Sequence, residues 1–456
     1  MNGDSTASDR DPLGVGPRGV DEVEFQEGNP PDGLARSDRL DLGSDSRRGG
    51  PPVRRLGDWD AERLRALAGE HGTPLYVLDR QRVRENYRRL AEAFPDADIY
   101  YAAKANTGLA TLRTLRREGA GVECASPGEL RAALDAGVAP ARIHYTAVNP
   151  PAEDFDSLMG FLRDAPATTV TAGAVDTLDR LANRGYSGRI ALRVNPGVGA
   201  GHHEKVATGA DAQFGVPAGQ VPAAVERARR DFRFVGIHAH VGSGILNHDL
   251  DRYRRAMARV GEIARSVQPI EFVDVGGGFG VPYRQSDPPL DLSEVADGIH
   301  NGLAGVDARL VLEPGRYVVA DAGVLLTRVN TRKEAPDAVV AGVDASLADM
   351  LRPALFDAHH PVRNLAADAD ERPVEEATVG GPVCSSADTF CENRPIARPE
   401  RGDVLAIGNT GAYGYELANR FHRRRLPAEV VVDGDRSWIS RRRDRFEDVE
   451  RPETTR

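Results

Sequence analysis

Short apolar runs that alternate with amphipathic stretches constrain the fold of this 456-residue chain more than any other feature. Eight of these runs are strand candidates, at residues 99–104, 121–126, 142–147, 168–173, 189–195, 234–242, 271–278 and 309–315. Helical periodicity appears between them at 109–118, 129–136, 176–183, 221–230 and 251–267. This alternation predicts an α/β fold with a (β/α)8 barrel. An open doubly wound sheet is the alternative, but no glycine-rich dinucleotide-binding loop follows the first strand.

The pattern changes on both sides of the predicted barrel, which we assign to residues 56–320. Residues 1–55 are rich in Gly, Asp, Ser, Arg and Pro, and they lack periodicity, which predicts a disordered N-terminal tail. Further strand candidates separated by turns predict an all-β C-terminal domain over residues 321–440; they lie at 324–330, 338–343, 376–380, 404–407 and 429–432. Residues 441–456 read as a charged tail. The apolar segment 74–79 suits a strand of either domain.

Net charge, the length of apolar runs and cysteine content argue against several classes of protein. The formal net charge of −10 argues against nucleic-acid binding, which usually needs a basic surface. No apolar run reaches the length of about 18 residues that a membrane span needs, and no signal peptide is recognisable. Cys124, Cys384 and Cys391 show neither the spacing of a metal site nor the even number of a disulfide framework. We therefore expect a reduced, cytoplasmic protein without a metal.

Lysine is scarce in this chain, and this scarcity draws attention to Lys104. Lys and Arg together number 59, and only Lys104, Lys205 and Lys333 are lysine, so that 59 − 3 = 56 are arginine. Lys104 directly follows the apolar residues of the first predicted barrel strand. Lysine, unlike arginine, can lose its proton and form an imine with a carbonyl group. We expect Lys104 to hold a carbonyl cofactor, with an ordinary surface lysine as the alternative.

Functional residues of such barrels lie at the carboxyl ends of the strands. Here those positions hold polar or glycine residues: Lys104, Ser126, Asn149, Asn195, His240, Ser243, Gly276, Gly277, Gly278, Glu313 and Arg316. Pyridoxal 5'-phosphate is the common cofactor of an imine-forming lysine. It needs a phosphate cradle, a partner for its ring nitrogen and a group against its ring face.

The strand ends offer a candidate for each need. Glycines 276–278 would let backbone N–H groups approach a phosphate, to which Ser243 could also bind. A carboxylate at Glu313 could keep a pyridine nitrogen protonated, and His240 could stack on the ring. Arg316 could hold a phosphate or a carboxylate with two hydrogen bonds. Taken singly, the same residues also suit a tight turn, a salt-bridged turn and a core histidine.

Six motifs, in order along the chain, make the sequence similar to a known family. They are YAAKAN at 101–106, HAHVGS at 238–243, GGGFG at 276–280, EPGR at 313–316, GGPVC at 380–384 and GAY at 411–413. Over roughly residues 70–435 the chain resembles the fold type III pyridoxal-phosphate decarboxylases, and most nearly the diaminopimelate decarboxylases. The resemblance implies a barrel followed by a β domain, and a homodimer with active sites shared between subunits. It also implies conversion of the amino acid meso-diaminopimelate to L-lysine and CO2.

The resemblance further implies roles for individual residues. Lys104 would bind the cofactor covalently, His240 would face its ring and Glu313 would pair with its nitrogen. Ser243, glycines 276–278, Arg316 and Tyr413 would complete the cofactor site. Cys384 would reprotonate the α-carbon from the neighbouring subunit. The substrate would contact Arg316, Arg352, Phe356, Ser385 and Tyr413, with Arg352 on its distal carboxylate.

Two departures from the family pattern leave the substrate open. Ser385 stands where the family has a glutamate that contacts the distal amino group, and Phe356 replaces a tyrosine near the distal carboxylate. A decarboxylase of another amino acid, such as carboxynorspermidine, ornithine or arginine, is therefore the alternative. Glu313 favours decarboxylation over racemisation, because a protonated ring is the stronger electron sink. A non-catalytic pyridoxal-phosphate-binding regulator is a third hypothesis, against which the retention of Lys104 and Cys384 argues.

Overall fold

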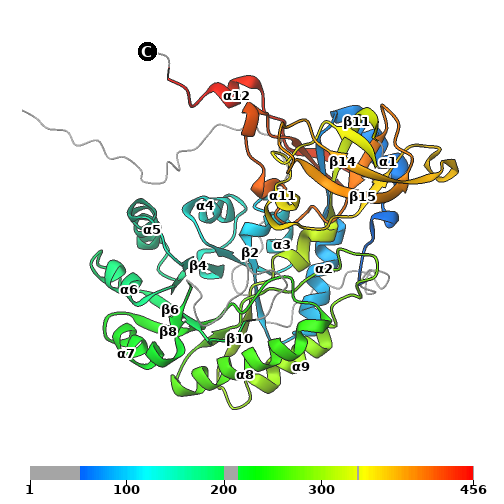
Figure 1. Cartoon of the computed structure of the whole chain (residues 1–456). Helices are drawn as coiled ribbons and strands as arrows, with labels where there is room; N and C mark the ends of the chain where they lie inside the picture. Colours follow the sequence, from blue (N-terminus) through cyan, green and yellow to red (C-terminus); the bar gives the residue numbers. More distant parts are fainter. Residues whose placement is uncertain (1–51, 200–213, 336–337, 455–456) are drawn as a thin grey trace, which may run out of the picture.

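A computed structural model describes residues 52–199, 214–335 and 338–454 of the chain. The described strands form two sheets, one closed into a barrel and one open (Figure 1). The disordered tail predicted over residues 1–55 falls almost wholly outside the described residues. At its end, the backbone N–H of Arg54 donates to Asp321 Oδ2 at 3.2 Å, so residues 52–55 are held against the folded chain and the predicted tail was too long there.

Eight parallel strands in the described residues close into a barrel, with the order β5-β4-β3-β2-β10-β9-β8-β6 and β5 paired to β6. They are β2 (Asp98–Ala102), β3 (Gly121–Cys124), β4 (Ile143–Ala147), β5 (Thr169–Ala172), β6 (Arg189–Asn195), β8 (Arg233–His238), β9 (Phe272–Asp274) and β10 (Arg309–Leu312). A two-residue strand, β7 (Val216–Pro217), adds to β6. Each of the eight barrel strands matches one predicted run. The pairing of β5 with β6 closes the ring, which confirms the predicted barrel and excludes the open doubly wound sheet.

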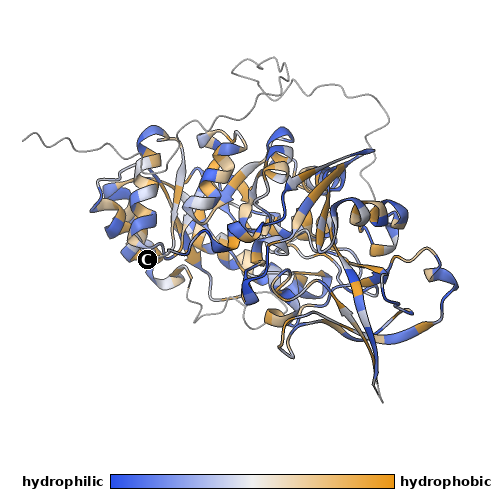
Figure 2. Ribbon diagram, turned by 90° about the horizontal axis from the view of Figure 1, so that it is seen from above, coloured by the Kyte–Doolittle hydropathy of each residue, from blue (hydrophilic) through white to orange (hydrophobic). Residues whose placement is uncertain are grey.

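Helices surround the barrel strands (Figure 1). They are α2 (Arg80–Ala93), α3 (Leu109–Arg117), α4 (Pro127–Asp135), α5 (Ala152–Asp164), α6 (Val175–Ala182), α7 (Val221–Asp231), α8 (Leu250–Ser266) and α9 (Leu292–Gly302). α8 shows why they pack there, because Tyr253, Met257 and Val260 recur at helical spacing and are fully buried. Figure 2 shows the result, with hydrophobic and hydrophilic residues alternating along these helices.

The second sheet is built mainly from the C-terminal part of the chain. It contains β1 (Leu75–Asp79), β11 (Gly323–Ala335), β12 (Ala338–Val343), β13 (Val362–Asn364), β14 (Val374–Gly380), β15 (Thr389–Ala397), β16 (Val404–Ile407), β17 (Ala428–Asp433) and β18 (Arg436–Arg441). Helices are short in this part apart from α1 (Ala61–His71); the others are α10 (Arg316–Val319), α11 (Arg352–Phe356) and α12 (Phe446–Glu450). The five predicted strands of this region are all present.

Strand β1 belongs to the second sheet, a choice that the sequence left open. It pairs antiparallel with β11 and parallel with β17. Leu56, Trp59 and Leu64, which precede it, pack in the same apolar cluster as Val324 and Val430. Residues 56–79 therefore lie with the second sheet, although we predicted that the barrel begins at 56.

The C-terminal residues are also more ordered than the predicted charged tail over 441–456. Arg441 ends β18, and the Arg443 guanidinium donates to the carbonyl oxygen of Pro74 at 2.7 Å. Arg442 pairs with Asp448 on α12 at 2.7 Å. Arg442 and Arg443 are ordered here because each finds a partner, which composition alone does not reveal. None of the helices in the described ranges is long and apolar enough to cross a membrane.

Candidate active site

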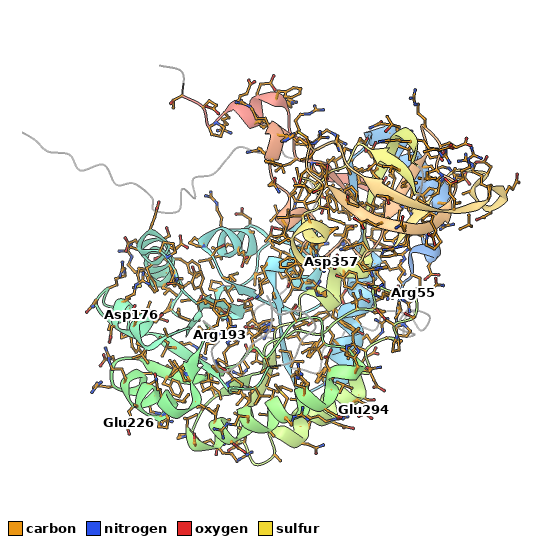
Figure 3. The ribbon with its side chains drawn as sticks, viewed as in Figure 1. Arg55, Asp176, Arg193, Glu226, Glu294 and Asp357 are labelled. Carbon is orange, nitrogen blue, oxygen red and sulfur yellow. The ribbon has the colours of Figure 1, made fainter. Side chains whose placement is uncertain are left out.

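A cavity of about 760 Å³ lies between the carboxyl ends of the barrel strands and the second sheet. It brings together seven residues that the sequence singled out: Lys104, His240, Ser243, Arg316, Arg352, Phe356 and Tyr413. Figure 3 labels two further lining residues, Arg193 on β6 of the barrel and Asp357 at the end of α11. Residues far apart in the sequence thus share one chamber, as the barrel prediction required.

Lys104 lies at the near end of the cavity, just after β2. Its Nζ contacts Glu123 Oε2 at 2.9 Å, because β2 and β3 pair with Ala102 opposite Glu123. The Lys104 side chain is 43% exposed, into the cavity, whereas that of Glu123 is only 2% exposed. Burial lowers the pKa of Lys104, but the charge of Glu123 outweighs it and the pKa is raised. Glu123 therefore holds the ammonium in place and can accept its proton when the amine reacts.

Glu313 follows β10 and lies in a buried polar network. His238 Nε2 is 3.0 Å from Glu313 Oε2, while Glu313 Oε1 is buried and has no hydrogen-bond partner among the described residues. Burial opposes ionisation of Glu313, but His238 and Lys104 lower its pKa. Burial and the charge of Glu313 raise the pKa of Asp274, so Asp274 keeps its proton and Glu313 is the charged partner. The free oxygen of an ionised Glu313 fits a protonated ring nitrogen.

The same network includes three side chains of metal-binding type. Atoms of His144, Asp274 and Glu313 lie within 4.8 Å of one another. The His144 ring stacks on Tyr100, at 3.8 Å between ring centroids, and burial lowers its pKa to about 4. Asp274 Oδ1 accepts the backbone N–H of Gly276 at 2.8 Å. Stacking and hydrogen bonding thus fasten this network to Tyr100 on β2 and to the backbone of Gly276.

Glycines 276–278 pack against residues of the cavity lining, such as His240, although they do not line the cavity themselves. A Cβ at Gly277 would lie 2.1 Å from the carbonyl oxygen of Glu313, so only glycine fits there. Gly278 has a φ of +91°, and a Cβ there would lie 2.3 Å from the carbonyl oxygen of Gly242. Nearby, Arg316 donates to Ser243 Oγ at 3.3 Å, and Arg316 Nε is buried without a partner among the described residues. Bare backbone beside an arginine with a spare donor suits a phosphate group.

His240 completes the near end. Its Nδ1 accepts the backbone N–H of Gly277 at 3.5 Å. Burial, together with the charges of Arg193 and Lys104, lowers the pKa of His240 to about 3. His240 therefore presents a neutral ring to the cavity, which suits stacking against an aromatic cofactor.

Two arginines and a tyrosine of the cavity lining form a cluster, Arg316, Arg352 and Tyr283, which we call the far end. Tyr283 Oη accepts hydrogen bonds from Arg316 Nη1 at 2.9 Å and from Arg352 Nη1 at 3.0 Å. Arg352 Nη1 also donates to His360 Nε2 at 2.6 Å. Neither guanidinium group is paired with a carboxylate in the described part of the chain.

Six expected site residues are not among those that line this cavity: glycines 276–278, Glu313, Cys384 and Ser385. Cys384 and Ser385 are exposed and follow β14. Cys384 Sγ is 3.7 Å from Nε2 of His422, a residue that does not line the cavity. Access to the cavity from the neighbouring subunit, which the resemblance implies for Cys384, remains a prediction.

Several residues of the site were missed at the sequence level: Arg193, His238, Asp274, Tyr283 and His360. His238 carried a usable signal, because it lies two residues before His240 on the same strand run. Tyr283 and His360 carried none, since both lie in loops where no periodicity assigns a direction to the side chain.

Comparison with known proteins gives consistent matches. Residues 80–320 match the family model described as "Pyridoxal-dependent decarboxylase, pyridoxal binding domain". A diaminopimelate decarboxylase of Methanothermobacter thermautotrophicus is 42% identical over 404 residues, which cover 84% of this chain and 92% of the relative. One from Escherichia coli K12 is 33% identical over 86% of this chain and 96% of the relative. The crystal structure of diaminopimelate decarboxylase from Helicobacter pylori complexed with L-lysine has a TM-score of 0.79 at 31% identity, covering 85% of this chain and 98% of that one.

Proposed function

Because the chain belongs to the pyridoxal-dependent decarboxylases, and among them to the diaminopimelate decarboxylases, we propose that it converts meso-diaminopimelate to L-lysine and CO2. Pyridoxal 5'-phosphate is its cofactor, and the enzyme is a carboxy-lyase. One observation of the cavity supports this substrate above all. Arg316 and Arg352 converge on Tyr283 without a carboxylate partner among the described residues, which suits the second carboxylate of a dicarboxylic amino acid.

The charge of the cavity agrees with such a ligand. Five lining residues are cationic (Lys104, Arg193, Arg284, Arg316 and Arg352) and two are carboxylates (Asp287 and Asp357). Buried cations are costly unless an anion accompanies them. The cofactor phosphate and a second carboxylate of the substrate would supply the missing negative charge.

The residues of the near end would hold the cofactor. Lys104 would bind its aldehyde carbon and Glu313 would keep its ring nitrogen protonated. The backbone at Gly277 and Gly278, with Ser243, Arg316 and Tyr413, would hold its phosphate. When bound, the cofactor supplies an electron sink for the pair of electrons that departing CO2 leaves behind.

The remaining residues orient the substrate and its proton. Arg352 and Arg316 would hold the distal carboxylate, so that the reacting carbon is fixed relative to Lys104. His240, neutral and half-buried, would cover the face of the ring and exclude water. Cys384 would deliver a proton to the α-carbon.

We propose that the enzyme is a homodimer in which Cys384 acts in the active site of the partner subunit. Its exposed position outside the cavity of its own chain supports this arrangement. Cys124, Cys384 and Cys391 are free thiols, which fits the cytoplasmic location proposed from the sequence.

Mixing two inactive variants tests the shared site. Lys104→Ala and Cys384→Ala subunits, mixed after reversible dissociation, should recover about a quarter of wild-type activity. Half of the randomly paired dimers are hybrids, and each hybrid has one intact site. Two differently tagged Lys104→Ala preparations, mixed in the same way, should recover none. No recovery in the first mixture would show that each subunit uses its own Cys384.

A CO2-release assay tests the substrate. Meso-diaminopimelate should be decarboxylated, and ornithine, arginine and carboxynorspermidine should have kcat/KM values lower by at least about a hundredfold. These three compounds have no second carboxylate, so Arg316 and Arg352 would remain unpaired. Phe356 in the cavity lining favours the alternative of another amino acid, and preferred turnover of one of these three would establish it. If none of the four compounds releases CO2, the result would favour the third hypothesis, a non-catalytic pyridoxal-phosphate-binding regulator.

A further inference from the structure

Tyr283 is the residue on which the far end of the cavity converges. It lies in the loop after β9, lines the cavity, and accepts hydrogen bonds from Arg316 on α10 and Arg352 on α11. Both guanidinium groups also lie near its ring, with centroid distances of 5.9 Å for Arg316 and 4.9 Å for Arg352. One side chain therefore sets the separation of two cations that belong to different elements.

The hydrogen bonds of Tyr283 leave one group unused. A phenol oxygen has two lone pairs and one hydrogen. The two arginines occupy the lone pairs, and no acceptor for the hydrogen is recorded among the described residues. The hydroxyl hydrogen is thus available to a ligand between the arginines.

The second partner of Arg352 fixes the direction of its guanidinium group. His360 Nδ1 lies 2.7 Å from the carbonyl oxygen of Gly408 and must donate to it, so His360 Nε2 is an acceptor for Arg352. Burial and the charge of Arg352 lower the pKa of His360 well below its ordinary value, so the ring is neutral. The far end consequently holds two cations and two neutral acceptors, an arrangement that lacks an anion.

We propose that Tyr283 determines specificity for the distal carboxylate, by holding Arg316 and Arg352 at a spacing that accepts one carboxylate and by donating its own hydrogen to that group. Tyr283 would thereby supply the hydroxyl that the family pattern places at position 356, where this chain has phenylalanine. The identity of the carboxylate rests on the proposed function.

The acidity of Tyr283 supports this role. Burial alone would raise its pKa, but the charges of Arg316 and Arg352 outweigh burial and lower the pKa below the ordinary value. A more acidic hydroxyl is a stronger donor to a carboxylate.

Two ligands that differ by one carboxylate test the proposal. L-lysine and 1,5-diaminopentane have the same chain and amino groups, and only L-lysine has the carboxylate. Their dissociation constants are measured with the holoenzyme by titration of the cofactor absorbance. In Tyr283→Phe, L-lysine should bind about 10- to 150-fold more weakly, as expected for a lost hydrogen bond to a charged group. Binding of 1,5-diaminopentane should change by less than about twofold.

Steady-state kinetics provide a second readout. In Tyr283→Phe the KM for meso-diaminopimelate should rise by the same factor as the L-lysine dissociation constant, with kcat within about threefold of wild type. A matched control is Tyr253→Phe, because Tyr253 is buried on α8 and its hydroxyl has no partner among the described residues. That variant should keep the wild-type ratio of the two dissociation constants.

Other outcomes would overturn the proposal. Equal weakening of both ligands in Tyr283→Phe would show that the hydroxyl only maintains the fold, and an unchanged ratio would show that it does not contact the carboxylate. If Tyr283→Phe melts too early to be titrated, Tyr283→His, which keeps a ring with a hydrogen-bonding nitrogen, should retain part of the L-lysine preference. A wild-type enzyme that prefers L-lysine yet releases no CO2 from meso-diaminopimelate would refute the proposed function alone.

Discussion

Replacing Lys104 with alanine should reduce CO2 release from meso-diaminopimelate to below detection while leaving the melting temperature close to that of the wild type. Lys104 is the lysine of the cavity, and its Nζ is the amine that would bind the cofactor. Lys104→Arg should be equally inactive. It keeps a positive charge beside Glu123, but a guanidinium group does not lose its proton and cannot act as a nucleophile.

The control for Lys104 is a lysine outside the site. Lys333 is exposed on β11, and Lys333→Arg should keep full activity. Borohydride reduction of the holoenzyme, followed by peptide mapping, should find the cofactor on Lys104. Cofactor on Lys333, or on Lys205 outside the described residues, would contradict the assignment.

Replacing Arg352 with methionine should lower kcat/KM for meso-diaminopimelate by about 30-fold to several thousandfold. This decrease corresponds to about 2–5 kcal/mol, the cost of removing one partner of a buried charge pair. Methionine keeps much of the length of the side chain, so packing against Tyr283 changes little. Arg352→Lys should recover part of the loss, because lysine keeps the charge but not the two parallel donors of a guanidinium group.

The control for Arg352 is an arginine on the surface. Arg259 pairs with Glu262 on the exposed side of α8, and Arg259→Met should leave kcat/KM unchanged. Unchanged kinetics in Arg352→Met would mean that the substrate has no distal carboxylate, and the assay with ornithine, arginine and carboxynorspermidine would then identify the alternative.

Much of the fold was predictable because its signals are local. Each barrel strand is a short apolar run between helical stretches. This alternation leaves few folds in which the apolar faces of strands and helices are all buried. The positions of Lys104, His240, Glu313 and the glycines 276–278 followed from the same pattern, since each ends a strand. Parallel strands in a barrel bring those ends to one face, so the predicted cofactor residues were expected to meet.

Segments without such a pattern were placed less well. The run 74–79 reads as a strand but contains nothing that selects a sheet, and it pairs with β11 and β17 through contacts with residues far along the chain. The charged C-terminal residues looked like a tail, yet Arg443 is held by the backbone of Pro74. Order at both places depends on partners that are distant in the sequence.

The sequence by itself determined the barrel, the β-rich second part and the reactive lysine with its expected cofactor residues, because strand periodicity, glycine and the chemistry of lysine are properties of short segments. Only the tertiary structure decided what surrounds that lysine. It placed Glu123 beside Lys104 and joined Arg316 to Arg352 through Tyr283. Tyr283 and Arg352 are 69 residues apart, and the loop after β9 brings Tyr283 to Arg352 on α11. Such contacts arise from packing of the whole chain, which no local pattern encodes.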